Sequence, residues 1–373
     1  MIPGLAIGPG FSDDQDMKAA VLEEFGKPLV VREMPAPELG TGEVLVDVVA
    51  APVLPYAAEV FRGERNYALT LPVVPGAGAV GRVRATGPDA TRLAPGDWVL
   101  CDPAVRSRDD ALTPDITLQG LSARGEGGLF LQRHFGHGSY AGQVLVPTEN
   151  AVPLGPVDPA EAGRWAALTL CLVPYGGLLA AELRPGETVL VSGATGNFGS
   201  AAVAVALAMG AACVVAPGRN EAALADLERR FGARVRTVRL TGDDDTARLR
   251  RAAPGPIDVV LDLLPPSAGT APVRTAAMTV REYGRVVLMG GVGMLGGDDL
   301  ALPYPWLMRN NITLRGQWLA PRTANASLIA LARAGLLDLD QFAVTEFGLD
   351  DIAGALDHAA GLTTRFALTV VRP

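Results

Sequence analysis

The sequence predicts an α/β protein with two domains: an antiparallel, barrel-like β domain and a domain built on a doubly wound parallel sheet. From Met17 onward, short apolar runs such as "GEVLVDVVAAPV" and "PGDWVLCDP" are separated by Gly and Pro at strand-length intervals. From about Arg164 onward, apolar strands alternate with helical runs, as in parallel sheets with crossover helices. The 373 residues are enough for two packed cores.

The change of pattern sets the expected domain boundaries. We expect residues 1–16 to be a flexible leader, residues 17–165 and 317–373 to form the β domain, and residues 166–316 to form the parallel-sheet domain. The closing "RFALTVVRP" is expected to be a strand that returns to the first domain. Residues 102–138 are polar, contain several Gly and show little periodicity, and they are expected to be an excursion at a domain edge.

Composition excludes several function classes. There are 32 basic and 40 acidic residues, a net charge of −8, and no Lys/Arg run, so a nucleic-acid partner is not expected. The three cysteines are too far apart for a disulfide framework or a CxxC metal site, which favours a reducing compartment. No apolar run reaches the ~20 residues of a membrane span, and the opening lacks the features of a secretory signal. We expect a cytoplasmic protein without a membrane partner and with a small-molecule partner.

The second domain is predicted to consist of alternating strands and helices. "ETVLVSG" is expected to be a strand, "GSAAVAVALAMG" a helix, and "ACVVAPG" the next strand. "NEAALADLERRFG" is predicted to be a helix capped by Asn220 and ended by Gly232. "IDVVLDLL", "GRVVLMGG" and "NITLRGQW" supply the remaining expected strands.

A glycine turn joins the first of these strands to its helix. A pyrophosphate can approach backbone N–H groups at a helix N-terminus only where no Cβ intrudes. Gly193 is assigned to the tight turn, Gly196 to the close approach and Gly199 to helix packing. A purely structural glycine turn is the alternative, but the strand before and the helix after favour nucleotide binding. The candidate cofactor-binding residues are Gly193, Ala194, Thr195, Gly196, Asn197, Phe198, Gly199, Gly218, Arg219, Asn220 and Gly290.

The end of the second strand indicates which dinucleotide binds. A free ribose 2′-hydroxyl usually meets Asp or Glu there, whereas a 2′-phosphate requires a cation. This chain has Arg219 and Asn220 at that place and no carboxylate before them, which favours NADP(H). The alternative is that Arg219 is a solvated surface arginine.

Taken together, these segments resemble the medium-chain dehydrogenase/reductase superfamily. The resemblance is carried by "LPVVPGAGAVGRVRATGPDATRLAPGDWV", the stretch from Met17 to "VDVVAAPV", the glycine turn and "GRVVLMGG", and it spans the chain from Met17. It implies a GroES-like catalytic domain made from both ends of the chain, a Rossmann domain between them, a cleft where nicotinamide meets substrate, and often a homodimer.

Zinc-containing members of that superfamily carry ligands that this chain lacks. Leu54 stands at the expected cysteine position, and Ala77 in "GAG" stands where a His-Glu pair begins. The third ligand would fall near Thr169 to Cys171, and we expect Cys171 to be a buried, inert cysteine. The structural zinc lobe retains only Cys101. We therefore expect no metal.

The motif "RHFGHG" places His134 and His137 at a spacing that suits metal ligands. No third ligand lies nearby in the sequence. We therefore expect a pair of loop histidines or a wall of the substrate entrance rather than a metal site.

Without a metal, charge developing on the substrate oxygen requires hydrogen-bond donors. Tyr56 lies two positions after Leu54, where zinc enzymes commonly carry a Ser or Thr proton relay, and Tyr67 resembles a pocket tyrosine of the quinone reductases. Tyr175 is expected to border the nicotinamide. These three tyrosines are the candidate catalytic residues. Simple pocket packing is the alternative for Tyr56, and a role as a core aromatic is the alternative for Tyr175. Glu59 and Arg62 are expected to be surface charges.

The sequence is compatible with three functions. The first is a zinc-independent, NADPH-dependent reductase of an activated C=C bond (an enone) or a quinone, because delocalisation in such acceptors reduces the need for a metal. The second is a metal-free NADP(H)-dependent alcohol/ketone oxidoreductase acting on an apolar carbonyl compound. The third is a non-catalytic NADPH-binding structural or regulatory protein. "VLPYAA" lacks the Asn and Asp that quinone reductases usually carry around this Pro, so specificity is not transferred.

Overall fold

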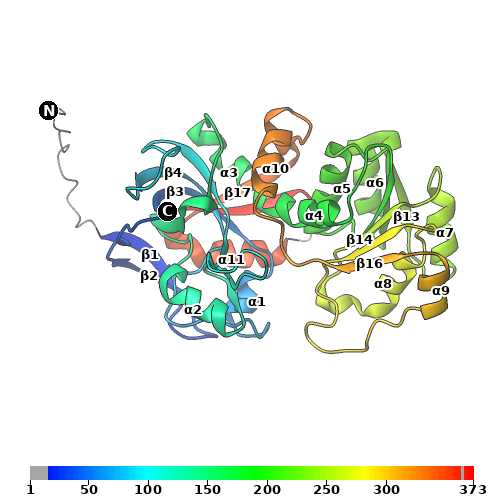
Figure 1. The fold of residues 1–373 in the computed structure, drawn as a ribbon, viewed down its shortest axis with the longest axis horizontal. Helices are drawn as coiled ribbons and strands as arrows, with labels where there is room; N and C mark the ends of the chain where they lie inside the picture. Colours follow the sequence, from blue (N-terminus) through cyan, green and yellow to red (C-terminus); the bar gives the residue numbers. More distant parts are fainter. Residues whose placement is uncertain (1–15, 363–364) are drawn as a thin grey trace.

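The computed structural model describes residues 16–362 and 365–373. Figure 1 shows two bodies side by side: one built from both ends of the chain and one from its middle. The expected leader, residues 1–16, lies outside the described residues except for Asp16. In the described part of the chain, no helix is long and apolar enough to cross a bilayer.

The first body is built around a seven-stranded sheet. Its strand order is β10-β5-β4-β3-β18-β17, and β9 also pairs with β3. Every pair is antiparallel except β17 with β18. The strands are β3 (Glu43–Val53), β4 (Ala79–Thr86), β5 (Trp98–Cys101), β9 (Gln143–Pro147), β10 (Ala151–Pro153), β17 (Ala343–Gly348) and β18 (Ala367–Arg372).

The return of the chain's end to this body is confirmed. In β18, Thr369 lies opposite Val53 of β3 in antiparallel register, and the whole of β18 lies alongside β17. Helix α11 (Ile352–Gly361) packs on both strands and on α1 (Ala57–Phe61). The remaining small elements of this body are β1 (Met17–Val21), β2 (Val30–Met34) and α3 (Ala162–Trp165).

Residues 102–138, which show little periodicity in the sequence, have regular secondary structure. They form a small lobe with a three-stranded sheet, made of β6 (Ala104–Arg106), β7 (Ile116–Leu118) and β8 (Ser122–Arg124), and the helix α2 (Gly125–Phe135). Strands of three residues are too short to show alternation, and three glycines in α2 lower its helix propensity. The helix is stabilised by packing on β7 and β8 rather than by its own sequence.

The second body contains a parallel six-stranded sheet with the order β13-β12-β11-β14-β15-β16. Within this sheet the first strand is β11. The chain then adds β12 and β13 on one side of β11 and crosses over to add β14 on the other side. In open α/β sheets, ligands bind at such a reversal of strand order, which lies here at the carboxyl ends of β11 and β14. The strands are β11 (Thr188–Ser192), β12 (Cys213–Gly218), β13 (Val235–Arg239), β14 (Val259–Asp262), β15 (Arg285–Leu288) and β16 (Thr313–Gly316).

Helices accompany this sheet, as the alternating sequence pattern predicts. Central strands β11 and β14 are buried along their whole length, as expected for strands of a parallel sheet. The helices are α4 (Leu168–Ala180), α5 (Asn197–Ala208), α6 (Glu221–Phe231), α7 (Asp245–Ala252), α8 (Thr270–Ala277) and α9 (Tyr304–Arg309). Helix α10 (Ala324–Arg333) packs on α4 and on β10 of the first body. The predicted ends of α6 are confirmed: Asn220 Oδ1 accepts from Ala223 N at 3.1 Å, and Gly232 has φ +58°.

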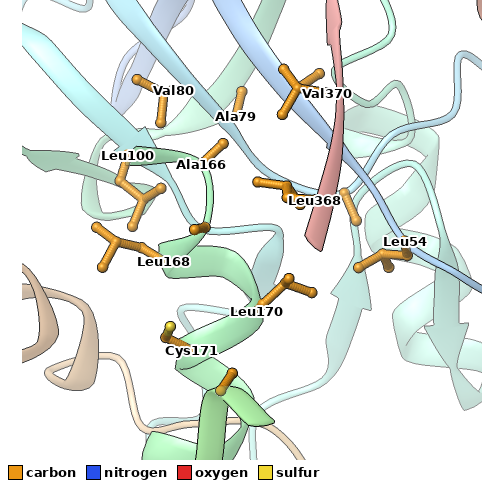
Figure 2. Close-up of a cluster of buried hydrophobic side chains, with 14 of the residues drawn as sticks. Leu54, Ala79, Val80, Leu100, Ala166, Leu168, Leu170, Cys171, Leu368 and Val370 are labelled. Carbon is orange, nitrogen blue, oxygen red and sulfur yellow. The ribbon is translucent and has the colours of Figure 1, made fainter. Parts of the chain in front are cut away.

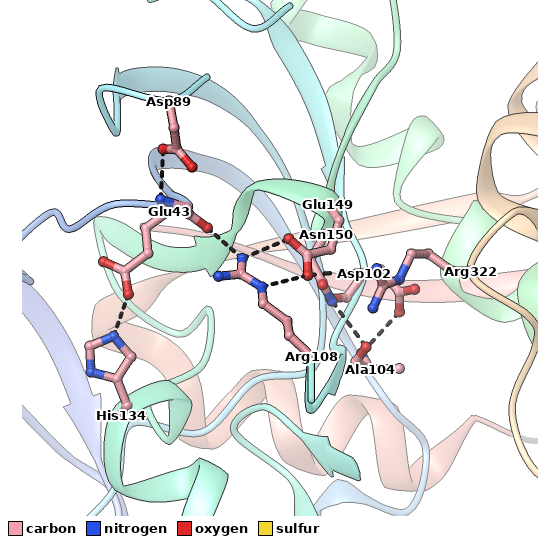
Figure 3. Close-up of polar contacts among 10 residues, drawn as sticks. Glu43, Asp89, Asp102, Ala104, Arg108, His134, Glu149, Asn150 and Arg322 are labelled. Atoms are coloured by element: carbon pink, nitrogen blue, oxygen red, sulfur yellow. Dashed lines mark hydrogen bonds and ion pairs between the residues drawn. The ribbon is translucent and has the colours of Figure 1, made fainter. Parts of the chain in front are cut away.

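Polar contacts fix the small lobe to its surroundings. Arg108 donates to Glu149 Oε2 at 2.7 Å and to the Gly42 carbonyl at 2.6 Å (Figure 3). At the start of the lobe, the buried Asp102 accepts from Asn325 Nδ2 of α10 at 2.9 Å. Arg106 donates to the Ala320 carbonyl at 2.7 Å. The lobe is thereby held against both the first sheet and the segment that leads into α10.

Candidate active site and cofactor cleft

The glycine turn has the geometry of an anion cradle. β11 ends at Ser192, and Gly193 adopts φ +87°, a conformation that L side chains rarely take. The Gly196 N–H donates to the Gly193 carbonyl at 2.9 Å, which closes the turn, and α5 begins at Asn197. The N-terminus of a twelve-residue helix therefore lies at the carboxyl end of β11, where the strand order reverses.

The three glycines of this turn differ in what surrounds them. A Cβ on Gly199 would overlap the Gly193 carbonyl oxygen, so this glycine allows α5 to pack against the turn itself. A Cβ on Gly196 would meet a single protein atom, the same oxygen, at 3.4 Å. The space next to Gly196 is thus free of protein, as the close approach of a pyrophosphate requires.

The end of β12 lies against the glycine turn. A Cβ on Gly218 would come within 2.5 Å of Thr195 Cγ2, so these two segments are in close contact. Arg219 is exposed and makes no hydrogen bond or ion pair with another described residue. Asn220, also a candidate cofactor residue, uses its side-chain oxygen to cap α6. Arg219 is therefore the residue that is free to bind a phosphate group.

Asn197 and its neighbours connect the turn to the first body. Asn197 Nδ2 donates to the Ala367 carbonyl of β18 at 2.7 Å, while its Oδ1 is buried without a described partner. Ala194 is fully buried and Phe198 packs against the main core. These residues hold the cradle at the junction of the two bodies.

Sequence reasoning missed a buried carboxyl beside the cradle. Asp262 ends β14, opposite Ser192 of β11, and is 3% exposed. A Cβ on Gly290, the last candidate cofactor residue, would lie 2.5 Å from Asp262 Oδ2. Burial raises the Asp262 pKa to about 6, although hydrogen bonds from Ser192 and the Leu264 amide oppose this. An acidic residue closing an apolar strand, as in "IDVVLD", was the available signal.

The structure brings two of the three candidate tyrosines together. Tyr56, at the start of α1, contacts Tyr67 edge-to-face with ring centroids 6.4 Å apart. The Arg65 guanidinium lies 4.4 Å from the Tyr56 ring centroid. Burial raises the pKa of Tyr56 above its ordinary value of 10, and the nearby Tyr67 adds to this. Its phenol therefore keeps its proton at neutral pH.

Tyr175 lies apart from this pair, on α4, and is almost fully buried. The ring contacts of the described residues pair Tyr56 with Tyr67 but not with Tyr175. Glu59 and Arg62 make ion pairs near the surface, with Arg65 and Glu64 respectively.

Apolar side chains occupy the positions where zinc ligands would stand. Leu54 and Cys171 lie in one cluster of buried hydrophobic side chains with Leu170 and Leu368 (Figure 2). Cys171 is fully buried, and burial raises its thiol pKa. Ala77 is buried too. Aliphatic side chains cannot coordinate a metal, and the described residues contain no group of three or more His, Cys, Asp or Glu that could do so. They do not fit a catalytic zinc.

The two histidines of "RHFGHG" have separate structural contacts. His134 is not a loop residue, as we expected, but lies in α2, where its Nε2 contacts the buried Glu43. His137 Nδ1 accepts from the Val74 N–H at 3.0 Å, and burial lowers the pKa of this ring. The neutral imidazole of His137 thereby connects the loop before "GAG" to the end of the lobe.

The fold and the cradle define a dinucleotide-binding α/β protein joined to a β domain. Comparisons agree with this class: residues 40–156 match the model of the alcohol dehydrogenase GroES-like domain, and residues 198–333 match that of the zinc-binding dehydrogenases. An alcohol dehydrogenase of Rhizobium meliloti (strain 1021) is 31% identical over 319 residues, 82% of this chain and 85% of that protein. The chain belongs to the medium-chain dehydrogenase/reductase superfamily.

More distant relatives and solved structures support the same conclusion. An NAD-dependent alcohol dehydrogenase of Sulfurisphaera tokodaii is 25% identical over 86% of this chain and 90% of its own length. A thermostable alcohol dehydrogenase from Pyrobaculum aerophilum has a TM-score of 0.73 and 26% identity, covering 96% of this chain and 100% of that one. A dehydrogenase from Sinorhizobium meliloti 1021 bound to NADP shares the fold with a TM-score of 0.78, at 21% identity, with coverage of 96% and 100%. The chain is therefore an oxidoreductase of the medium-chain type, for which a nicotinamide dinucleotide is the expected cofactor.

The different surroundings of Gly196 and Gly199 lead to opposite expectations for their alanine variants. Gly196→Ala should leave the midpoint of thermal unfolding within about 2 °C of the wild type, yet weaken dinucleotide binding about tenfold or more because the methyl group fills the pyrophosphate space. Gly199→Ala should destabilise the fold by about 2 kcal/mol or more, because the new Cβ overlaps backbone. Calorimetry of unfolding and of cofactor binding measures both effects.

Gly255→Ala, in open space outside the cleft, is the matched control for this pair. This variant should change neither the midpoint of thermal unfolding nor the affinity for the dinucleotide. Wild-type dinucleotide affinity in Gly196→Ala would contradict the assignment of the cradle.

The raised Asp262 pKa predicts a pH dependence of stability. The folded protein keeps this proton up to about pH 6, whereas the unfolded chain loses it near the ordinary value of 3.8. Asp262 therefore contributes most to stability below about pH 4, and this contribution falls by about 3 kcal/mol as the pH rises through 6. The amide of Asp262→Asn cannot ionise. The free energy of unfolding of this variant, relative to that of the wild type, should therefore rise by about 3 kcal/mol as the pH rises from about 4 to above 6.

Urea unfolding at several pH values between about 4 and 7.5 measures this difference. The exposed Asp109→Asn serves as the control and should follow the wild-type profile. A profile of Asp262→Asn parallel to that of the wild type would show that the carboxyl does not titrate in this range.

Proposed function

We propose that this protein is a zinc-independent, NADPH-dependent oxidoreductase that transfers hydride to an activated C=C bond of an enone or to a quinone. The observation that carries the proposal is the replacement of metal ligands by aliphatic side chains, Leu54 and Ala77, inside a buried apolar cluster. The substrates that fit such surroundings are apolar carbonyl compounds, enones or quinones.

The chain's own residues would support this reaction in two ways. When bound, reduced nicotinamide supplies the hydride. The phenol of Tyr56, which burial keeps protonated, is a hydrogen-bond donor for a substrate oxygen that gains negative charge. Its hydroxyl has no hydrogen-bond partner among the described residues, so it is available for that role. In an enone or quinone the charge is delocalised, so one donor replaces part of what a Lewis acid would supply.

A metal-free NADP(H)-dependent alcohol/ketone oxidoreductase is the second candidate. It is favoured by the relatives, since the proteins of Rhizobium meliloti and Pyrobaculum aerophilum are both named alcohol dehydrogenases. The two candidates use the same cofactor cradle and differ in the bond that is reduced.

Product analysis separates these candidates. The purified protein is incubated with NADPH and an enone, and the product is identified by mass spectrometry and NMR. We expect the saturated ketone, with about one NADPH oxidised per product. An allylic alcohol would instead favour the second candidate. Elemental analysis is expected to find no stoichiometric zinc, and full activity that is lost on chelation and restored by zinc would overturn the metal-free mechanism.

We also propose that the cofactor is NADP(H), on the basis of the exposed, unpaired Arg219 guanidinium beside the cradle. Relatives include NAD-dependent enzymes, and one neighbour in fold was solved with NADP. Arg219→Asp should weaken NADPH binding about tenfold or more, through the loss of a charge-assisted contact and like-charge repulsion, and weaken NADH binding much less. Fluorescence titration with both coenzymes measures the ratio.

Arg92→Asp, an exposed arginine of the β4–β5 loop, controls for the change in net charge. It should leave the preference between the two coenzymes unchanged. Equal losses for NADPH and NADH in Arg219→Asp would remove the basis for NADP(H).

We further propose a homodimer in which two copies meet along β16. This strand is the last in the parallel sheet, its four residues are all exposed, and Leu314 is 42% exposed. Tyr304 and Met308 of the neighbouring α9 are also exposed. An exposed strand edge with apolar neighbours is a typical surface for pairing with a second copy.

Light scattering tests this assembly. The wild type should have the mass of two chains, and Leu314→Asp should shift the equilibrium towards the single chain because a charge would be buried at the interface. Leu336→Asp, which changes an exposed leucine next to α10, should stay dimeric. A monomeric wild type would exclude this interface.

A further inference from the structure

A groove outside the cofactor cradle has no role in the proposed reaction. It has a volume of about 480 Å³ and lies where the small lobe, helix α4 and the segment after β16 meet. None of the residues that line it belongs to the glycine turn or to the end of β12. Its size falls in the range of small-molecule sites.

The lining of this groove contains three arginines and a single carboxylate. Arg106 and Arg124 come from the lobe, Arg315 comes from β16, and Glu182 is the only acidic residue of the lining. The chain as a whole carries a net charge of −8. The groove therefore has the opposite sign to the molecule around it, and a local excess of positive charge attracts anions.

The guanidinium groups keep donors free for a ligand. Arg124 has no hydrogen bond or ion pair with any other described residue, and Arg315 donates only to the Ala180 carbonyl, at 3.2 Å. Arg106 donates to two backbone carbonyls, and its nearest carboxylate, Asp102, is 3.9 Å away. Each guanidinium carries five N–H donors, so most of those of Arg124 and Arg315 are unused.

An aromatic surface lies beside these charges. The Trp318 side chain lines the groove and is 47% exposed, and the Arg124 guanidinium lies 5.8 Å from its ring centroid. Leu112, Pro114 and Ile116 of the lobe and Leu179 of α4 add apolar walls. A ligand with a planar apolar body and a charged end matches this combination.

We propose that this groove is a binding site for a small planar organic acid, whose carboxylate is held by Arg124 and Arg315 and whose ring or conjugated chain lies on Trp318. In this proposal the small lobe helps to bind the ligand, because it contributes Arg106, Arg124 and the loop at Leu112. It is independent of the proposed reaction, because its residues are separate from the cradle. Arg315 also lies in β16, but its side chain is directed to α4, away from the backbone edge.

The test uses cinnamate as the probe and cinnamamide as its uncharged counterpart. Calorimetric titration is carried out on the full chain with saturating NADP⁺, so that the cofactor cradle is filled and no hydride is present to reduce the C=C bond of either probe. Cinnamate should bind, and cinnamamide should bind about tenfold more weakly because it lacks the charge. Raising NaCl from about 20 to about 500 mM should weaken the binding of cinnamate but not that of cinnamamide.

Variants assign the binding to the groove. Arg124→Gln and Arg315→Gln should each lower cinnamate affinity about five- to tenfold without changing that of cinnamamide. Arg92→Gln, an exposed arginine far from the groove in sequence, should match the wild type. Urea unfolding and light scattering confirm that each variant keeps its stability and mass. Equal affinity for the acid and the amide, or wild-type cinnamate affinity in both groove variants, would overturn the proposal.

Discussion

The structure depends on one steric constraint: the contact of the first turn of α5 with the Gly193 carbonyl, which Gly199 makes possible. This contact brings the helix N-terminus to the carboxyl end of β11, where the strand order reverses. It also places Asn197 within reach of β18, so that the same turn that faces the cofactor is hydrogen-bonded to the other body. The glycine turn therefore belongs both to the cofactor cradle and to the junction of the two bodies.

Local patterns predicted most of the second body. Strands β11, β12, β14, β15 and β16 and the capped helix α6 follow from apolar runs, a cap residue and glycine stops, which lie within a few residues of each other. Strand β13 was not predicted. The lobe at 102–138 could not be predicted in this way, because its short strands and glycine-containing helix are stabilised by contacts with one another. The position of His134 in a helix was missed for the same reason.

The candidate site could be predicted where its residues follow one another in the sequence. The glycine turn lies in one stretch, so its bare backbone could be inferred before the fold was known. The contact of Asp262 with Ser192 and the position of Arg106, Arg124 and Arg315 around one groove depend on packing between segments far apart in the sequence. Tyr56 and Tyr67 are close in sequence, but only the structure shows that their rings touch while Tyr175 stays apart.

The pairing of β18 with β3 affects how the protein is made. Strand β3 can receive this neighbour only after the chain has been synthesised through β18, which lies more than 300 residues further along the sequence. The middle of the chain forms a sheet from consecutive segments and can fold first. The first sheet waits with one side of the Ala51–Val53 end of β3 unpaired, because β9 covers only Glu43–Asp47. During translation this open side is a target for unwanted strand addition. Rapid completion of synthesis, or a chaperone that covers β3, would protect the nascent protein.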